Sequence, residues 1–267
     1  MQMKRARVFE TANPGRLMAM ALGIVVSLAS SAGAQSADLE RGDQLYARGQ
    51  LKEAKQAYQA ALPNDARGYA SHWRLARVES ELSEESRGED QRQLIASSVV
   101  HARAAVKAAP DSAQGHVWLA VTLGRQALKE GPKTRLALSR EIKSEVDRAI
   151  ALDPTIGRAY HVRAMWNRKL ATLNFMERSV ANTVLGGVPK GATMENAVRD
   201  LQKAVELEPG YINHRLELGR TYMMLKDHDQ ARRELEKAAS LPPGGSARDP
   251  RYQAEARELL AKLPNRD

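Results

Sequence analysis

The six histidines are the residues of this chain best suited to metal or acid–base chemistry, and they are scattered singly. They are His72, His101, His116, His161, His214 and His228. A zinc site on a helix needs two imidazoles on the same face, which H-x-x-x-H or H-E-x-x-H spacing provides. Neither motif occurs in this sequence. We interpret these histidines as surface or packing residues. We therefore expect no metal site and no cofactor.

Other local catalytic motifs are also absent from the sequence. The pairs Gly186-Gly187 and Gly244-Gly245 lack the Lys-Ser or Lys-Thr of a phosphate loop, and they fit helix ends better. No G-x-S-x-G elbow occurs, and the chain contains no cysteine for thiolate or disulfide chemistry. We predict that the protein is not an enzyme, while a site assembled from distant residues is an alternative that local spacing does not address.

A second pattern suits binding, because cationic and apolar residues alternate along helices that we expect to line the inner groove of a helical stack. The predicted groove residues are Trp73, Arg77, Val117, Val121, Arg125, His161, Met165, Arg168, Lys169, Leu216, Arg220, Met223 and Met224. Arginines form charge-assisted hydrogen bonds with carboxylates or phosphates, and methionine and valine offer adaptable apolar contact. In the alternative interpretation, the apolar members pack inside the protein and the basic members are solvated.

The elements that would position these residues carry a repeated signature. Ala, a large apolar residue and a second Ala recur at fixed spacing before a turn, as in AKQAYQAALPND from Ala54, AVRDLQKAVELEP ending at Pro209, and ARRELEKAASLPP ending at Pro243. Small residues let two helices approach closely, the large residue fills the gap beside them, and the proline ends the helix. The signature resembles the second helix of a tetratricopeptide repeat.

The spacing of the repeats is regular at the end of the chain and stretched in the middle. The interval from Pro209 to Pro243 has the length of one tetratricopeptide repeat, whereas the interval from Pro154 to Pro209 is much longer. In the first repeat we expect Gly42 and Ala54 to make the close contact and Tyr58 to fill the gap beside them.

The long interval contains an apolar stretch with helical period at 173–185, and Thr193 is suited to cap the next helix. Asp249 and Pro250 suit the start of a last helix that covers the end of the stack. We predict an all-α fold: a tetratricopeptide-like right-handed solenoid of about five helix pairs with elongated middle helices, one inserted helix and a C-terminal capping helix.

The segment 1–34 differs in composition from the rest of the chain. Basic residues precede an uncharged run at 17–28, and Ala32-Gly33-Ala34 follows, which is the order of a secretory signal peptide cleaved before Gln35. The apolar run is shorter than the roughly 20 residues that span a bilayer as a helix, so a retained anchor is the less favoured alternative. We predict a signal peptide at 1–34, a repeat domain at 35–267, and a periplasmic or secreted bacterial protein.

Charge gives no sign of nucleic-acid binding. The whole chain carries +9; without the signal segment 37 basic and 31 acidic residues remain, a net charge of +6. No basic stripe with interleaved aromatic residues occurs, and aromatic residues make up only 4% of the chain. We therefore expect no nucleic-acid partner.

The stretch from Ala105 to Leu263 resembles the regulator of microtubule dynamics family. The resemblance is carried by DRAIALDP, by the insert NFMERSVANTVLGGVPKGATMENAV, by LQKAVELEPGY and LGRTYMMLKD, and by the closing EARELLAKL. It implies a helical domain that binds other molecules and has no known active site. Relatives in that family are associated with microtubules and organelle membranes, but the signal segment leads us to expect no microtubule partner here.

Two functions remain open from the sequence. The first is an adaptor or assembly protein that binds a peptide or protein partner in its concave groove. The second is a carrier of a lipid or other amphiphile, with the insert at 173–185 closing over the groove and Arg77, Arg125 and Arg220 facing an anionic headgroup.

Overall fold

The computed structural model describes residues 37–65, 67–185, 187–188, 191–244 and 246–264, and this part of the chain contains helices and no strand. The elements are a helix at 37–47, α2 (Leu51–Ala61), η1 (Leu62–Asn64), α3 (Tyr69–Glu85), α4 (Gly88–Ala108), α5 (Ala113–Ala127), α6 (Pro132–Leu152), α7 (Gly157–Ala171), α8 (Phe175–Leu185), α9 (Met194–Leu207), α10 (Ile212–Met224), α11 (His228–Ser240) and α12 (Asp249–Leu260). The all-α prediction is confirmed. The predicted signal segment lies outside the described residues.

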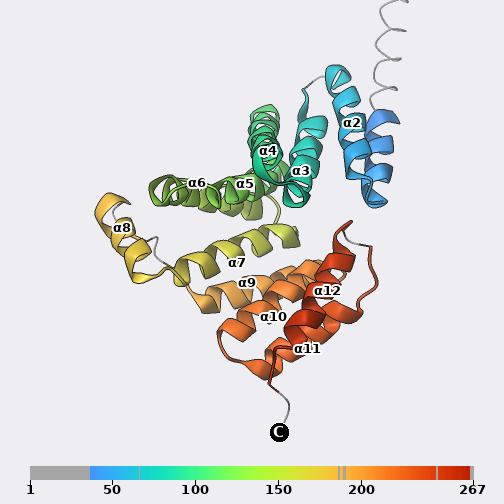
Figure 1. The fold of residues 1–267 in the computed structure, drawn as a ribbon. Coiled ribbons are helices and arrows are strands. Elements are labelled where there is room, and N and C mark those ends of the chain that lie inside the picture. Colours follow the sequence, from blue (N-terminus) through green and yellow to red (C-terminus); the bar gives the residue numbers. More distant parts are fainter. Residues whose placement is uncertain (1–36, 66, 186, 189–190, 245, 265–267) are drawn as a thin grey trace, which may run out of the picture.

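The helices associate as consecutive pairs that stack into a curved solenoid (Figure 1). α3 packs on α4, α5 on α6, α7 on α9, and α10 on α11, and each pair also contacts the next pair along the chain. α12 packs on α10 and α11, as expected of a capping helix. None of the described helices is long and apolar enough to cross a bilayer.

The close packing at the two ends agrees with the predicted signature. A Cβ atom on Gly42 would lie 2.3 Å from the ring of Tyr58, which is fully buried. A Cβ atom on Gly219 would lie 2.7 Å from Cγ of the buried Leu235. Both glycines are therefore required by a close helix–helix approach, because any side chain would displace the large residue opposite.

The stretched middle of the chain forms two long helices and an inserted one. α4 and α6 have 21 residues each, and α8 packs on α6 beyond the pairs of the solenoid (Figure 1). Thr193 caps α9 as predicted, since its side chain accepts a hydrogen bond of 3.1 Å from the Asn196 N–H. The insert thus lies against the first turns of α6 and the end of α7, where Glu177 of α8 faces Arg135 and Lys169.

The solenoid closes on itself, because its C-terminal segment meets its first helix pairs. Arg248, just before α12, forms an ion pair with Glu84 near the end of α3. Ala247 packs against the apolar cluster of the N-terminal helices, and in Figure 1 this segment lies beside them. The helices consequently enclose an inner space. An open solenoid, in contrast, would have a long groove along its concave side.

Candidate binding pockets and membership of a family

The structure contains a cavity of about 440 Å³ beneath the inserted helix α8, which we call the α8 pocket. It lies between the end of α5, the start of α6, the second half of α7, and α8, with Met224 of α10 at its edge. Its lining residues are Gly124, Ala127, Leu128, Pro132, Arg135, Leu136, Ser139, Ile142, Val162, Met165, Trp166, Arg168, Lys169, Leu170, Thr172, Leu173, Glu177, Val180 and Met224. Most of these side chains are apolar.

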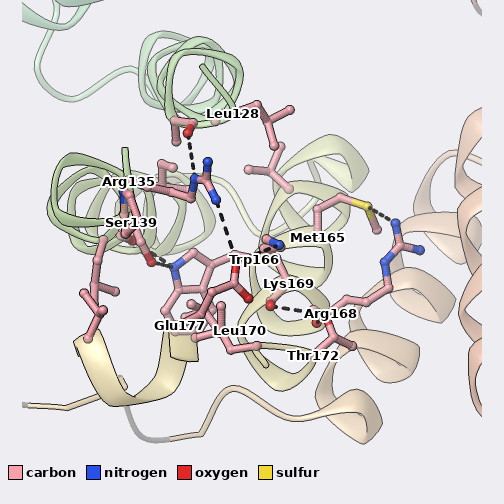
Figure 2. Close-up of a pocket in the computed structure, with 18 of the residues that line it drawn as sticks. Leu128, Arg135, Ser139, Met165, Trp166, Arg168, Lys169, Leu170, Thr172 and Glu177 are labelled. Atoms are coloured by element: carbon pink, nitrogen blue, oxygen red, sulfur yellow. Dashed lines mark hydrogen bonds and ion pairs between the residues drawn. The ribbon is translucent and has the colours of Figure 1, made fainter. Parts of the chain in front are cut away.

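The polar groups of this wall already bind one another. The indole N–H of Trp166 donates to the carbonyl of Ser139 at 2.8 Å and contacts its hydroxyl at 2.9 Å (Figure 2). The Arg135 guanidinium donates to the carbonyls of Ala127 and Glu130, which caps the end of α5. The interior of the pocket therefore presents mainly hydrocarbon.

The edge of the α8 pocket is cationic. Glu177 of α8 lies 3.7 Å from Arg135 and 3.8 Å from Lys169, both measured between charged atoms (Figure 2). One carboxylate thus faces two cations, and half of the Lys169 side chain remains exposed. The site combines an apolar interior with an excess of positive charge at its edge.

A second cavity, of about 390 Å³, lies inside the closed solenoid, and we call it the inner cleft. Its lining residues are Glu81, Glu84, Trp118, Val121, Arg125, Arg158, His161, Val162, Met165, Tyr211, Asn213, Glu217, Arg220, Arg248, Arg251, Tyr252 and Glu255. Val162 and Met165 of α7 line both cavities. The inner cleft is lined mainly by polar and charged residues, whereas the α8 pocket is lined mainly by apolar ones.

Comparison with known proteins identifies the family. The model of "Regulator of microtubule dynamics protein 1-3" matches residues 38–264. This chain belongs to the regulator of microtubule dynamics family. The match includes the two N-terminal helix pairs, which the motifs quoted from the sequence did not cover.

Regulator of microtubule dynamics protein 3 of Rattus norvegicus is 31% identical over 227 residues, covering 83% of this chain and 47% of the relative. Regulator of microtubule dynamics protein 1 of Caenorhabditis elegans is 30% identical over 190 residues, covering 71% and 83%. The chain thus spans about half the length of the rat relative. A solved TPR protein of Thermus thermophilus, TTC0263, superposes with a TM-score of 0.64 at 18% identity, covering 85% of this chain and 99% of that one. This likeness shows a tetratricopeptide-like fold.

The structure distributes the predicted groove residues of this family member over several places. Met165, Arg168, Lys169 and Met224 line the α8 pocket. Val121, Arg125, His161, Met165 and Arg220 line the inner cleft. Val117 and Leu216 lie in the core, fully buried, and do not line a groove, while Trp73 and Met223 pack at the edges of two core clusters.

The predicted arginines have carboxylate partners within the chain. Arg77 pairs with Asp43 at 3.3 Å and stacks on Tyr46. The other pairs are Arg125 with Glu84, Arg168 with Glu217, and Arg220 with Glu255. These arginines hold helices together, so their role toward a ligand remains a prediction.

Several residues that build the two cavities were not among the predicted groove residues. Trp166 and Leu136 shape the α8 pocket, and Trp118 and Arg158 shape the inner cleft. The repeat pattern assigns Trp118 only to the packing of its own repeat. Arg158, the second residue of α7, lies three residues before His161, so the groove pattern does reach it when continued by one helical turn, although it was not among the predicted groove residues.

Two histidines that are distant in the sequence face each other near the inner cleft. Nδ1 of His161 lies 3.0 Å from Nδ1 of His214, and Nε2 of His214 lies 3.1 Å from Glu208 Oε2. A ring nitrogen accepts a hydrogen bond only when it is unprotonated, so both rings cannot be imidazolium in this geometry. Burial lowers the pKa of both. His214, Arg168 and Arg158 lower the pKa of His161 further, whereas Glu208 offsets part of the effect on the pKa of His214.

We expect the protein to lose stability between pH 6.5 and 5.5 because of this pair. The unfolded chain takes up protons on these histidines near pH 6.5, whereas the folded protein takes them up only at lower pH, so the free energy of unfolding falls as the pH falls. For His161, whose pKa lies well below its ordinary value, the loss should be about 1 kcal/mol over this interval, and the lowered pKa of His214 should add to it. Urea denaturation at several pH values should show a smaller slope for His161→Gln and an unchanged slope for the exposed His228→Gln; equal slopes would contradict the assignment.

No group of three or more histidine, cysteine, aspartate or glutamate side chains that could hold a metal ion occurs in the part of the chain that the structure describes. His116 is engaged with Glu145 and the carbonyl of Pro110 instead. The names of the relatives likewise state no catalytic activity.

Proposed function

We propose that this protein is a non-catalytic binding protein that holds the hydrocarbon part of an amphiphile in the α8 pocket. The supporting observation is an apolar cavity of about 440 Å³ whose wall polar groups are already hydrogen-bonded to the chain itself. A peptide backbone placed there would leave N–H and C=O groups unpaired, at about 1–3 kcal/mol each. An acyl chain has no such groups and gains about 0.8 kcal/mol per buried CH₂.

The charge at the edge of the pocket supports an anionic head group. Arg135 and Lys169 share the single carboxylate of Glu177, which leaves one positive charge beside the apolar interior. An amphiphile with a carboxylate or phosphate head could pair with Lys169 while its tail enters between α6, α7 and α8. We therefore assign the head group to Lys169. The sequence had instead led us to expect it at Arg77, Arg125 and Arg220.

Gly124 offers a direct test, because it lines the pocket and a Cβ atom on it would meet no atom within 4 Å. Gly124→Phe should fill the cavity and weaken binding of a dansyl-labelled fatty acid at least tenfold, as measured by fluorescence titration. Gly124→Ala is the matched control: it should retain binding and raise stability by about 1 kcal/mol, since alanine is the better helix former.

Two results would contradict the proposal. One is a purified wild-type protein that neither enhances the fluorescence of the labelled fatty acid nor retains an amphiphile in native mass spectrometry. The other is equal binding by Gly124→Phe and Gly124→Ala, which would place the probe elsewhere on the protein.

A protein partner is the second function that we propose, and the outer face of α8 favours it. Phe175 and Met176, in the first turn of α8, are 86% and 74% exposed, and Leu128, which lines the α8 pocket, is also exposed. Exposed apolar clusters of this kind mark interaction surfaces. The predicted groove arginines already form ion pairs within the chain, which leaves them less available to a protein partner. We therefore place the partner on the exposed apolar residues of α8.

Crosslinking in the native host tests the second function. One defined partner should be captured by the wild-type protein and lost with Phe175→Ser/Met176→Ser, while fatty-acid binding is retained. Val100→Ser, which changes a single exposed apolar residue on α4, should retain the partner. Capture that is identical in all three proteins would count against this surface.

We also propose that the protein is exported, with residues 35–267 as its mature domain. The support is the order of basic residues, apolar run and Ala32-Gly33-Ala34 within the segment 1–34. Mass spectrometry of the protein from its host should give an N-terminus at Gln35. An intact N-terminus would instead support a retained anchor or a different location, and it would remove our reason for excluding a microtubule partner.

A further inference from the structure

Arg158 lines the inner cleft and lies over two aromatic rings. Its guanidinium carbon lies 5.1 Å from the centre of the Trp118 ring and 4.8 Å from that of Tyr211. These rings come from α5 and from the residue before α10, while Arg158 itself is at the start of α7. Aromatic faces stabilise a cation without using its N–H donors.

The other arginines of the cleft use their donors within the protein. Arg125 and Arg248 pair with Glu84, and Arg220 and Arg251 pair with Glu255. For Arg158, in contrast, the described residues provide neither an ion pair within 4 Å nor a hydrogen bond to the guanidinium. Five arginines and four glutamates line the cleft, so among the described residues it carries one net positive charge.

Two buried polar groups beside Arg158 also lack hydrogen-bond partners among the described residues. The indole N–H of Trp118, a residue only 3% exposed, has no acceptor. Glu81 is 5% exposed; its Oε1 accepts a hydrogen bond of 2.6 Å from the Tyr46 hydroxyl, while its Oε2 has no donor. Leaving such groups unpaired in a protein interior costs about 1–3 kcal/mol each, and more for a charged group.

These three groups define the chemistry of a ligand. A carboxylate or phosphate can accept two parallel hydrogen bonds from a guanidinium, and a further one from an indole N–H. The free oxygen of Glu81 requires a donor, which a hydroxyl group next to the anion would supply. We propose that the inner cleft is a second ligand site, in which Arg158 and Trp118 bind the carboxylate or phosphate of a small hydroxylated molecule and Glu81 binds its hydroxyl.

This site is independent of the amphiphile proposed for the α8 pocket. The two cavities lie against different parts of α7 and share only Val162 and Met165 among their described lining residues. Gly124→Phe should therefore weaken fatty-acid binding at least tenfold and leave binding in the cleft unchanged. Conversely, substitutions at Arg158 should leave fatty-acid binding unchanged, so that failure of one proposal is distinguishable from failure of the other.

Isothermal titration calorimetry of the mature protein with lactate, glycerol 3-phosphate and inorganic phosphate tests the site. We expect binding of at least one of the hydroxylated anions, and the comparison of lactate with glycerol 3-phosphate distinguishes a carboxylate from a phosphate ligand. Methyl lactate, which lacks the charge, should not bind. Inorganic phosphate should bind more weakly than glycerol 3-phosphate if Glu81 binds the hydroxyl.

Three variants assign the residues. Arg158→Gln should weaken binding at least tenfold, and Trp118→Phe, which keeps an aromatic ring and removes the N–H, should weaken it about threefold to tenfold. Arg103→Gln removes an arginine of an exposed pair with Glu141 and should bind like the wild type. Absence of binding by the wild type at millimolar concentration, or wild-type affinity in both Arg158→Gln and Trp118→Phe, would overturn the proposal; circular dichroism confirms that each variant is folded.

Discussion

Replacing Arg163 with methionine is expected to lower the free energy of unfolding by about 3–5 kcal/mol. Arg163 binds Asp200 through two parallel hydrogen bonds of 2.9 and 2.7 Å, and the amide of Asn167 donates to the same carboxylate at 3.1 Å. The Asp200 side chain is only 6% exposed. Without Arg163 a buried carboxylate would lose its main counter-charge, which is the costly case of a broken buried pair. Urea denaturation measures the difference.

A surface pair in the same protein provides the control. Arg103 also binds Glu141 with two hydrogen bonds, of 2.6 and 3.0 Å, but half of the Arg103 side chain is exposed. Arg103→Met should cost less than about 1 kcal/mol, because water replaces the lost contacts. Adding Asp200→Asn to Arg163→Met should recover part of the loss by removing the buried charge. Similar costs for Arg163→Met and Arg103→Met would contradict the assignment.

Leu235→Ala is expected to destabilise the protein by about 2–5 kcal/mol, and the effect should depend on Gly219. Leu235 is fully buried on α11, and its side chain occupies the space into which a Cβ atom on Gly219 would project. Gly219→Ala alone should be destabilising, because an overpacking cost of about 1–3 kcal/mol exceeds the gain of about 1 kcal/mol from better helix propensity. In the Leu235→Ala background the same change should be neutral or stabilising.

A double-mutant cycle measures this dependence by urea denaturation. The coupling between positions 219 and 235 should be at least about 1 kcal/mol, as found for residues in direct contact. Gly124→Ala, where the added methyl group meets no atom within 4 Å, should stabilise the protein in both backgrounds by the same amount. Additive effects of Gly219→Ala and Leu235→Ala would show that the two helices can separate to admit the methyl group.

The regular parts of the solenoid could be predicted because their contacts are local. Gly42 and Tyr58 have the same separation in the sequence as Gly219 and Leu235, and each pair belongs to one helical hairpin. The spacing of small and large residues within a hairpin is therefore sufficient to predict which side chains meet. The inserted helix and its neighbouring cap at Thr193 could be predicted for the same reason, from helical period and capping residues.

The arrangement of the candidate binding sites could be predicted only in part. Arg125, Arg168 and Arg220 stand out in the sequence by their charge, but the carboxylates that bind them come from other helices: Glu84 of α3, Glu217 of α10, and Glu255 of α12. Which carboxylate approaches which arginine depends on how the hairpins rotate against one another. That rotation is set by the packing of all pairs together, so it could not be obtained from the spacing within one repeat.

The sequence by itself determined the helical hairpins, their number, the stretched middle and the insert, because each depends on residues close together in the chain. Only the tertiary structure decided that α8 covers an apolar pocket and that Arg248 brings the C-terminal segment against Glu84 to enclose the inner cleft. It also left the Arg158 guanidinium without a carboxylate within 4 Å among the described residues, so that Glu208 and Glu81 stabilise its charge only from a greater distance. The physical reason is that the curvature of a solenoid is the sum of small rotations between its repeats, and this sum decides which distant side chains meet.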